Sequence, residues 1–230
     1  MDRVEIILRH MIDRGVLPNI MTYHSLIQGY SDTDMWSEAI RLFEEMTHRG
    51  IQSNIVTWKL LMTSLCKHGR TNEAKVMFDS MVRRGHKPDV TCYSIMLHGY
   101  ATKGCLLDVS NLFISMVRDG IVPEQTAINI LISAYSDHGK MDEAILMFDK
   151  IRQQGVQSHV TNYAALVDAL FNKGFYAQGG FVKIKELISQ MNKKGLCPNI
   201  VFFGLVINNF CTEGKVTEEV CSRMFLCILI

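Results

Sequence analysis

The chain has 230 residues, of which 48% are hydrophobic and 20% are charged, so it is long enough and apolar enough to bury a core. Its 24 lysines and arginines are balanced by 23 aspartates and glutamates. This balance excludes a protein held to nucleic acid mainly by attraction to phosphates, because such proteins are strongly basic. Any contact with nucleic acid must therefore depend on local patches and on the bases.

The cysteines and the two ends of the chain predict neither disulfides nor a membrane span. The seven cysteines contain no C-x-x-C pair and accompany no secretory signal, so we expect free thiols without a chemical role. Residues 1–15 carry three acidic side chains and no long apolar segment, unlike a signal or transit peptide. Residues 224–230 are apolar but far too few to cross a bilayer.

A fixed spacing of glycine, proline and methionine indicates that the chain is built from repeats. Glycines recur at intervals of 35, 35, 35, 35 and 40 residues, at Gly15, Gly50, Gly85, Gly120, Gly155 and Gly195. All four prolines follow one of these glycines by three residues, and a methionine or isoleucine precedes each glycine by four. Residue types that keep one phase over most of a chain are the signature of a repeat array.

The spacing divides the chain into five full repeats between two incomplete ones. Residues 1–19 form half a repeat, which contains only a second helix. The full repeats are residues 20–54, 55–89, 90–124, 125–159 and 160–199, and an incomplete repeat covers residues 200–230. The last full repeat has five extra residues, which we place near residues 175–179. Capping repeats are absent, which is typical of a fragment of a longer array.

Each repeat is predicted to contain two helices. In the first full repeat, apolar side chains lie at helical spacing within residues 23–30 and again within residues 39–46. The recurring glycine is expected to end the second helix in a left-handed conformation. Thr22, Thr57 and Thr161 stand near the starts of first helices, where a hydroxyl can cap free N–H groups.

Small residues in the first helices complete the prediction of the fold. They recur in the middle of these helices, at Gly29, Ser64, Gly99, Ala134 and Ala169. We expect them to let the two antiparallel helices of a hairpin pack closely. One hairpin cannot bury its apolar face alone, so neighbouring hairpins must stack. The predicted fold is all-α, a right-handed α-solenoid of antiparallel helical hairpins with a 35-residue period.

Residues 55–89, IVTWKLLMTSLCKHGRTNEAKVMFDSMVRRGHKPD, resemble the pentatricopeptide repeat of plant organellar RNA-binding proteins. The phased Thr-aromatic, Ala-x-x-x-Phe and Met-x-x-x-Gly elements carry the resemblance, which covers practically the whole chain. Within this family, the chain is similar to the P-type, restorer-of-fertility-like branch. The nearest rival, the tetratricopeptide repeat, has a W-x-x-L-G-x-x-Y signature that does not occur here.

The resemblance implies that each repeat binds one base of single-stranded RNA through first-helix side chains that face a concave groove. In the family, the fifth and last residues of a repeat hydrogen-bond the base edge, and the second residue packs on the base faces. The implied base-selecting pairs are His24 with Asn54, Lys59 with Asp89, Ser94 with Glu124, Asn129 with His159, and Ala164 with Asn199. The implied base-packing residues are Met21, Val56, Thr91, Thr126, Thr161 and Val201.

Several of these residues depart from the family's usual pattern, which has Asn, Ser or Thr at the fifth position and Asp, Asn or Ser at the last. The departures are His24, Lys59, Ala164, Glu124 and His159. By the family's readout, Ser94 indicates a purine and Asn129 a pyrimidine. Asp89 indicates U or G, and Asn54 and Asn199 indicate C or A.

Lys67, Lys103 and Lys173 stand at the ends of first helices, and two interpretations of them remain open. In the first interpretation, these lysines contact RNA phosphates along the groove. In the second, each only stabilises the C-terminus of its helix, by about 0.3–1 kcal/mol. No His or Cys pair has the spacing of a zinc site, and the methionines stand at helix-packing phases. We therefore predict no metal and no cofactor.

A rough energy balance predicts weak binding. Stacking on aromatic platforms contributes roughly 1–3 kcal/mol per base, and Thr or Val should contribute at or below the low end. Five such sites give on the order of 5 kcal/mol, while association itself costs about 4–15 kcal/mol. We expect a dissociation constant of about micromolar or weaker.

The sequence contains no phosphate-binding loop, deaminase signature or nucleophile motif, so we predict a non-catalytic protein. The leading hypothesis is sequence-selective binding of a single-stranded organellar transcript, which serves RNA processing, stability or expression together with protein processing factors. No membrane and no small-molecule substrate are implied. The resemblance indicates the mitochondrion, with the chloroplast as the alternative. The rival hypotheses are a protein-interaction solenoid and a decayed gene fragment.

Overall fold

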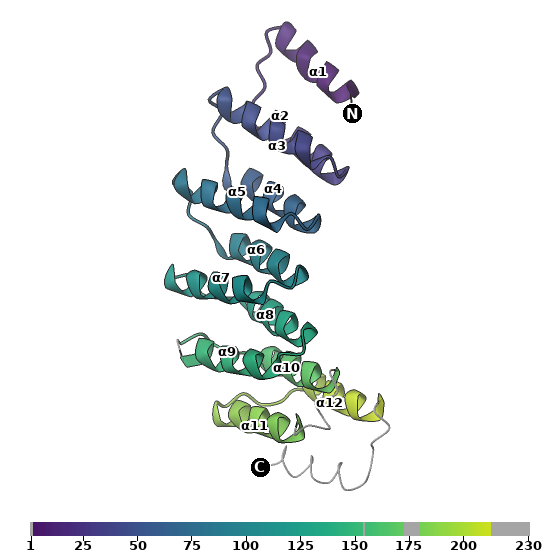
Figure 1. Ribbon diagram of the computed structural model, residues 1–230, viewed down its shortest axis with the longest axis vertical. Coiled ribbons are helices and arrows are strands. Elements are labelled where there is room, and N and C mark those ends of the chain that lie inside the picture. The colour runs from purple at the N-terminus through teal and green to yellow at the C-terminus, as the bar shows by residue number, and fades with distance from the viewer. Residues whose placement is uncertain (1, 154, 173–179, 213–230) are drawn as a thin grey trace. The chain divides into compact units, whose positions relative to one another are not determined.

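The chain is helical throughout the part that the structure, a computed structural model, describes: residues 2–153, 155–172 and 180–212 (Figure 1). These residues contain twelve helices and no strand, as the sequence predicted. The helices are α1 (Asp2–Asp13), α2 (Ile20–Asp32), α3 (Trp36–His48), α4 (Ile55–Lys67), α5 (Thr71–Arg83), α6 (Val90–Thr102), α7 (Leu106–Arg118), α8 (Gln125–Asp137), α9 (Met141–Gln153), α10 (Val160–Asn172), α11 (Gly180–Lys193) and α12 (Ile200–Thr212).

The helices alternate between two kinds, which we call first and second helices. The first helices are α2, α4, α6, α8, α10 and α12, and the others are second helices. First helices α2 to α10 begin 35 residues apart, and α12 begins 40 residues after α10. The positions near residues 175–179, where the sequence placed the extra residues, lie outside the described residues.

A glycine ends each described second helix, as the sequence predicted. Gly85, for example, follows α5 with φ 85°, and its N–H donates to the carbonyl of Val82 at 2.9 Å. A side chain at this φ is disfavoured, so glycine allows the chain to leave the helix here. The same positive φ recurs at Gly15, Gly50, Gly120, Gly155 and Gly195.

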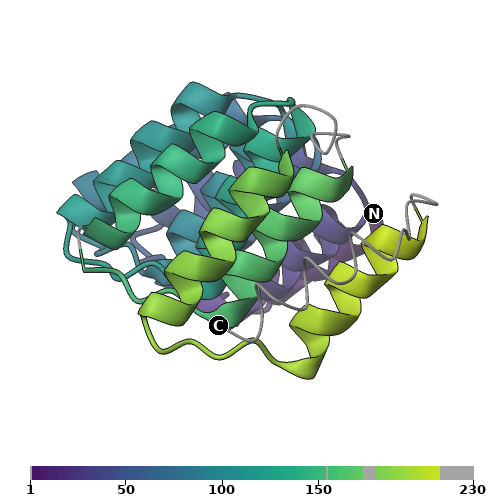
Figure 2. The same cartoon turned by 90° about the horizontal axis from the view of Figure 1, so that it is seen from below.

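The chain divides into two compact units, residues 1–105 (the N-terminal unit) and residues 106–230 (the C-terminal unit). In the N-terminal unit, α2 packs on its hairpin partner α3 and α4 on α5, while α4 also packs on α2 and α6. In the C-terminal unit, α10 lies beside its partner α11 and also contacts α8 and α12 (Figure 2). The first helices of each unit therefore form a continuous row.

Aromatic side chains join three of the second helices, α3, α5 and α9, to the first helix of the next repeat. Three pairs meet edge to face, with ring centroids 4.6, 5.3 and 5.2 Å apart: Phe43 with Trp58, Phe78 with Tyr93, and Phe148 with Tyr163. All six side chains are buried. Such pairs stabilise by about 0.5–1.5 kcal/mol beyond the burial of their area. They fix the position of one hairpin on the next within each unit.

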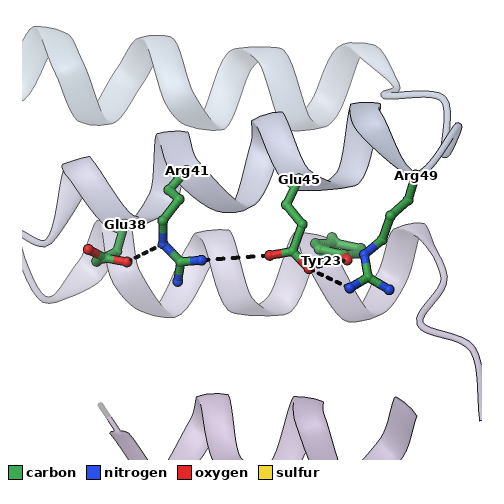
Figure 3. A network of polar contacts seen from close by, with 5 residues as sticks. All are labelled: Tyr23, Glu38, Arg41, Glu45 and Arg49. Atoms are coloured by element: carbon green, nitrogen blue, oxygen red, sulfur yellow. Dashed lines mark hydrogen bonds and ion pairs between the residues drawn. The ribbon is translucent and has the colours of Figure 1, made fainter.

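A polar network adds to the apolar packing between α2 and α3 (Figure 3). The Tyr23 hydroxyl donates to Glu45 Oε1 at 3.1 Å, and Arg49 contacts the same oxygen at 3.0 Å. Arg41 bridges Glu45 and Glu38. Burial, together with the charge of Glu45, raises the pKa of Tyr23, so its hydroxyl stays protonated and keeps donating at neutral pH. The network ties the first turn of α2 to α3.

The small residues of the first helices differ from the prediction in what they approach. A Cβ added to Gly99 of α6 would lie 2.5 Å from Cys66 Sγ and 3.4 Å from Thr71 Cγ2. Both neighbours belong to the preceding repeat, so the close approach joins adjacent repeats, whereas the sequence predicted one within the hairpin. At Gly29 of α2, an added Cβ would meet no atom within 4 Å.

Gly29 and Gly99 stand at the same repeat position, but their different surroundings predict that substitution by Ala has opposite effects on stability. Gly99→Ala should lower the free energy of unfolding by about 1–2 kcal/mol, because overpacking costs more than the helix propensity of Ala returns. Gly29→Ala should raise it by about 0.5–1 kcal/mol. Urea unfolding followed by circular dichroism measures both. Adding Cys66→Ala to Gly99→Ala should recover most of the loss; no recovery would contradict the assigned contact.

Candidate nucleic-acid interface

One face of each first helix carries the residues that the resemblance assigns to base binding. The second-position side chains are all exposed, at Met21, Val56, Thr91, Thr126, Thr161 and Val201. The fifth-position side chains are all half-buried, at His24, Lys59, Ser94, Asn129 and Ala164. Residues three apart share a helix face, and the first helices pack on one another within each unit. Equivalent side chains therefore form one row in the N-terminal unit and one in the C-terminal unit.

The last residue of a repeat starts the first helix of the next repeat. Asn54 Oδ1 accepts a hydrogen bond from the Thr57 N–H at 3.0 Å and so caps α4. Equivalent bonds run to Asp89 from Cys92 N–H at 3.0 Å and to Asn199 from Phe202 N–H at 2.9 Å. An N-cap residue has extended backbone, which brings its side chain beside the free N–H groups of the first turn.

This capping role differs from the sequence prediction, which assigned it to threonine hydroxyls. At α2 the two residue types share the task. Asn19 Oδ1 accepts from Thr22 N–H at 3.1 Å, and the Thr22 hydroxyl accepts from Asn19 N–H at 3.4 Å. The missed signal is an Asn or Asp directly before the first helices α2, α4, α6 and α12.

Lys59 and Asp89, the pair of repeat 55–89, lie in direct contact. Lys59 Nζ stands 2.6 Å from Asp89 Oδ2, while Asp89 Oδ1 accepts the capping bond from Cys92. Burial raises the pKa of Asp89, but the hydrogen bonds from Lys59 and Cys92 outweigh it, so the pKa is lowered overall. Asp89 is thus ionised at neutral pH, and each of its oxygens already has a donor.

Asn129, the fifth residue of repeat 125–159, is held by a residue that sequence reasoning missed. Asn162 of α10 donates from Nδ2 to Asn129 Oδ1 at 3.1 Å. Asn162 Oδ1 accepts from the backbone N–H of His159 at 2.9 Å. The Asn162 side chain is fully buried. A polar residue at the buried third position of a repeat is the signal that would have found it.

The other predicted pairs show no direct bond within the described residues. His24 is half-buried and Asn54 exposed, and the structure gives no hydrogen bond between them. Ala164 has no polar group, so Asn199 alone offers one in that repeat. Glu124 is exposed and precedes α8 without a side-chain capping bond. Ser94 is half-buried in the N-terminal unit.

The lysines assigned to phosphate lie at the far end of the first helices from the base-selecting residues. Lys67 is the last residue of α4 and Lys103 follows α6; both are exposed, whereas Lys173 lies outside the described residues. Lys67 comes eleven residues after Val56, about three turns or roughly 16 Å along the same helix face. The sequences of α8, α10 and α12 contain no Lys or Arg. Both phosphate-assigned lysines that the structure describes therefore belong to the N-terminal unit.

The described residues show no metal cluster, and two of their thiols are buried. They hold no group of three or more His, Cys, Asp or Glu side chains arranged to bind a metal ion. Burial raises the pKa of Cys66 and of Cys92 to about 11, which keeps both thiols protonated and unreactive at neutral pH. None of the helices in residues 2–153, 155–172 and 180–212 is long and apolar enough to span a membrane.

Stacked helical hairpins that repeat equivalent positions on one face of their first helices define a class, the helical repeat proteins. Family comparisons identify the kind of repeat. A model described as the PPR repeat family matches residues 18–63 and 53–102, and one described as the PPR repeat matches residues 91–121 and 127–156. A pentatricopeptide repeat domain model matches residues 146–213. The chain belongs to the pentatricopeptide repeat family.

Solved structures with the same fold include several from plants. The pentatricopeptide repeat protein PPR10 from maize matches 87% of this chain with 27% identity and a TM-score of 0.70. PPR10 in complex with an 18-nt psaJ RNA element matches 99% of it with 19% identity and a TM-score of 0.59. The chain spans only 28% and 37% of those two proteins.

A shorter relative is matched over nearly its whole length. The PPR domain of Arabidopsis thaliana protein-only RNase P 1, in complex with tRNA, matches 80% of this chain and 95% of its own. The identity is 13% and the TM-score 0.58, so this likeness concerns the fold alone. A comparison with curated protein sequences found no significant match.

The lowered pKa of Asp89 predicts how acid acts on the N-terminal unit. Because the folded pKa lies below the unfolded one, the stabilisation is complete above the unfolded value near 4 and disappears as the pH falls through the folded value. Asp89→Asn keeps an acceptor for the cap but cannot pair ionically with Lys59. Wild type should therefore unfold at higher urea than Asp89→Asn at pH 6, and the two midpoints should converge towards pH 3. A constant difference across that range would refute the assignment.

Proposed function

We propose that this chain binds single-stranded RNA along the exposed face of its first helices, with about one nucleotide per repeat. The observation that carries the proposal is the uniform arrangement of that face. From α2 to α10, an exposed second residue lies one turn before a half-buried fifth residue. A base that lies between successive second-position side chains would bring its edge to the fifth and last residues.

The relatives support this proposal. The maize protein PPR10 has been solved with an RNA element, and the RNase P 1 domain with tRNA. We further propose that the bound RNA is an organellar transcript, that its processing, stability or expression is the outcome, and that protein factors are recruited to the complex. We place the protein in the mitochondrion, or alternatively the chloroplast, in a non-catalytic role of the kind performed by fertility restorers.

The small number of exposed lysines supports weak binding. Among the described residues, Lys67 and Lys103 are exposed on or beside the first helices of the N-terminal unit, and the helices α8, α10 and α12 themselves contain no Lys or Arg. Few phosphate contacts and few bulky side chains at the second position keep the dissociation constant at about micromolar or weaker.

Titration of the chain into fluorescently labelled RNA of about ten nucleotides tests the proposal. Anisotropy should rise for some single-stranded sequences with micromolar midpoints, and a fully paired duplex of the same sequence should bind at least tenfold more weakly. Equal affinity for duplex and single strand, or no binding by any sequence in a randomised pool, would rule the proposal out.

The salt dependence of that binding distinguishes the two interpretations of the exposed lysines. If Lys67 and Lys103 contact phosphates, replacing both with Gln should reduce the slope of log K against log salt by about 1.4. Lys150→Gln with Lys193→Gln, which removes two exposed lysines from second helices, is the matched control and should leave the slope unchanged. An unchanged slope in the first variant, with a lower unfolding midpoint, would favour the helix C-terminus effect alone.

The contact between Lys59 and Asp89 predicts that repeat 55–89 reads its base poorly. Lys59→Ala should free one oxygen of Asp89 and raise discrimination among bases at that nucleotide about threefold, because an acceptor becomes available. Lys75→Ala, which breaks the ion pair with Asp79 on second helix α5, is the control. Comparing four RNAs that differ at one nucleotide measures the effect. Equal discrimination in Lys59→Ala and wild type would contradict the prediction.

A further inference from the structure

A buried asparagine connects two adjacent repeats of the C-terminal unit at the base-selecting face. Asn162 is in the first turn of α10, and none of its surface is exposed. Its side chain bonds both to Asn129 of α8 and to the backbone of His159. These two residues are the predicted base-selecting pair of repeat 125–159. Asn162 therefore contacts both members of the pair without facing solvent itself.

The backbone N–H of His159 fixes which way each amide points. An N–H group can only donate, so the Asn162 atom that lies 2.9 Å from it must be the oxygen Oδ1. The Asn162 amide nitrogen then faces Asn129, 3.1 Å from its oxygen. Asn129 consequently accepts from Asn162, and its own amide nitrogen has no partner among the described residues.

We propose that Asn162 is a positioning residue that holds Asn129 as a hydrogen-bond donor towards the base. This inference rests on the proposed function, and it deepens it. The free group on Asn129 is an NH2, so repeat 125–159 recognises its base through an acceptor atom, a carbonyl oxygen or an unprotonated ring nitrogen. Other repeats have Thr57 or Cys92 at the position of Asn162, and these side chains bond no fifth residue there.

Uracil and cytosine are the probes that reveal the direction of the Asn129 amide. Their atoms 3 and 4 have opposite character: uracil has a donor at N3 and an acceptor at O4, and cytosine has the reverse. Asn129 can bond the base at atom 3 or at atom 4. In either case, turning the Asn129 amide over exchanges a donor for an acceptor, so the preference between uracil and cytosine must reverse. The two pyrimidines are nearly equal in size, so packing contributes little to the comparison.

Two substitutions of Asn162 should change the orientation of the Asn129 side-chain amide: one should turn it over, and the other should leave it free to rotate. In Asn162→Asp, the introduced carboxylate still accepts from the His159 N–H but cannot donate to Asn129. The Asn129 amide should then turn, donate to this carboxylate and present its oxygen to the base. In Asn162→Ala nothing holds the amide, and it should meet either pyrimidine equally well.

The experiment compares the affinities of wild type and variants for two RNAs that differ by one U or C at the nucleotide read by repeat 125–159. That nucleotide is found as the one whose discrimination disappears in Asn129→Ala. Wild type should prefer one pyrimidine about threefold to tenfold, the effect of one hydrogen bond. Asn162→Asp should prefer the other by a similar factor, and Asn162→Ala should bind both within about twofold.

Asn209→Ala is the matched control. Asn209 of α12 also bonds between first helices, donating to Asp168 of α10 at 3.0 Å, but its bond involves no fifth-position residue. The control should bind with the preference of wild type. If Asn162→Asp and Asn162→Ala both keep that preference while remaining folded by circular dichroism, the inference is overturned and RNA binding itself stands.

A measurement without RNA separates failure of this inference from failure of the proposed function. In NMR spectra of the free protein, the Asn162 side-chain amide protons should exchange slowly with water, and those of Asn129 should exchange rapidly. The opposite pattern would overturn the inference even if Asn162→Asp does not fold. Absence of RNA binding by wild type would instead overturn the proposed function, and the NMR pattern would still decide how Asn129 is held.

Discussion

The packing of each first helix on its neighbours is the constraint on which the other features depend. A hairpin of two helices, each about thirteen residues long, leaves apolar surface that only another hairpin can cover. In each compact unit that surface is covered in two ways. First helices contact one another directly, and a phenylalanine such as Phe43 inserts beside an aromatic residue such as Trp58 of the next repeat. Because the contacts recur, side chains at equivalent positions lie in a row, and a row is what a strand of successive bases requires.

The same geometry gives the last residue of a repeat two tasks. Asn54, Asp89 and Asn199 each cap the next first helix, and the same residues are predicted to bind the base edge. Asn54 and Asp89 each commit an oxygen to the cap, so only their remaining hydrogen-bonding capacity is available to RNA. Capping contributes typically about 1 kcal/mol. A change of base preference at this position therefore also changes helix stability, which couples recognition to folding.

The contacts of Lys59 and Asn129 show what the selecting residues of two repeats can offer to a base. Lys59 is not merely an unusual fifth residue, because its ammonium group occupies the free oxygen of Asp89. Asn129 matches the pattern, yet its direction is decided by Asn162 from the following repeat. If the repeats read bases as we propose, what each one recognises depends on contacts beyond its own two selecting residues. The weak RNA binding that we propose has the same origin, since several repeats offer few free polar groups and little bulk to a base.

The sequence alone determined the all-helical architecture and the glycines that end each second helix, because both depend on local periodicity and backbone conformation. It also located the candidate face, since residues three apart share one side of a helix. Tertiary structure decided what the side chains contact. Gly99 approaches Cys66 of the preceding repeat, Lys59 pairs with Asp89, and Asn162 meets Asn129. Each contact joins two helices of adjacent repeats. The relative position and rotation of such helices depend on packing between the repeats, and the residue spacing within one helix does not determine them.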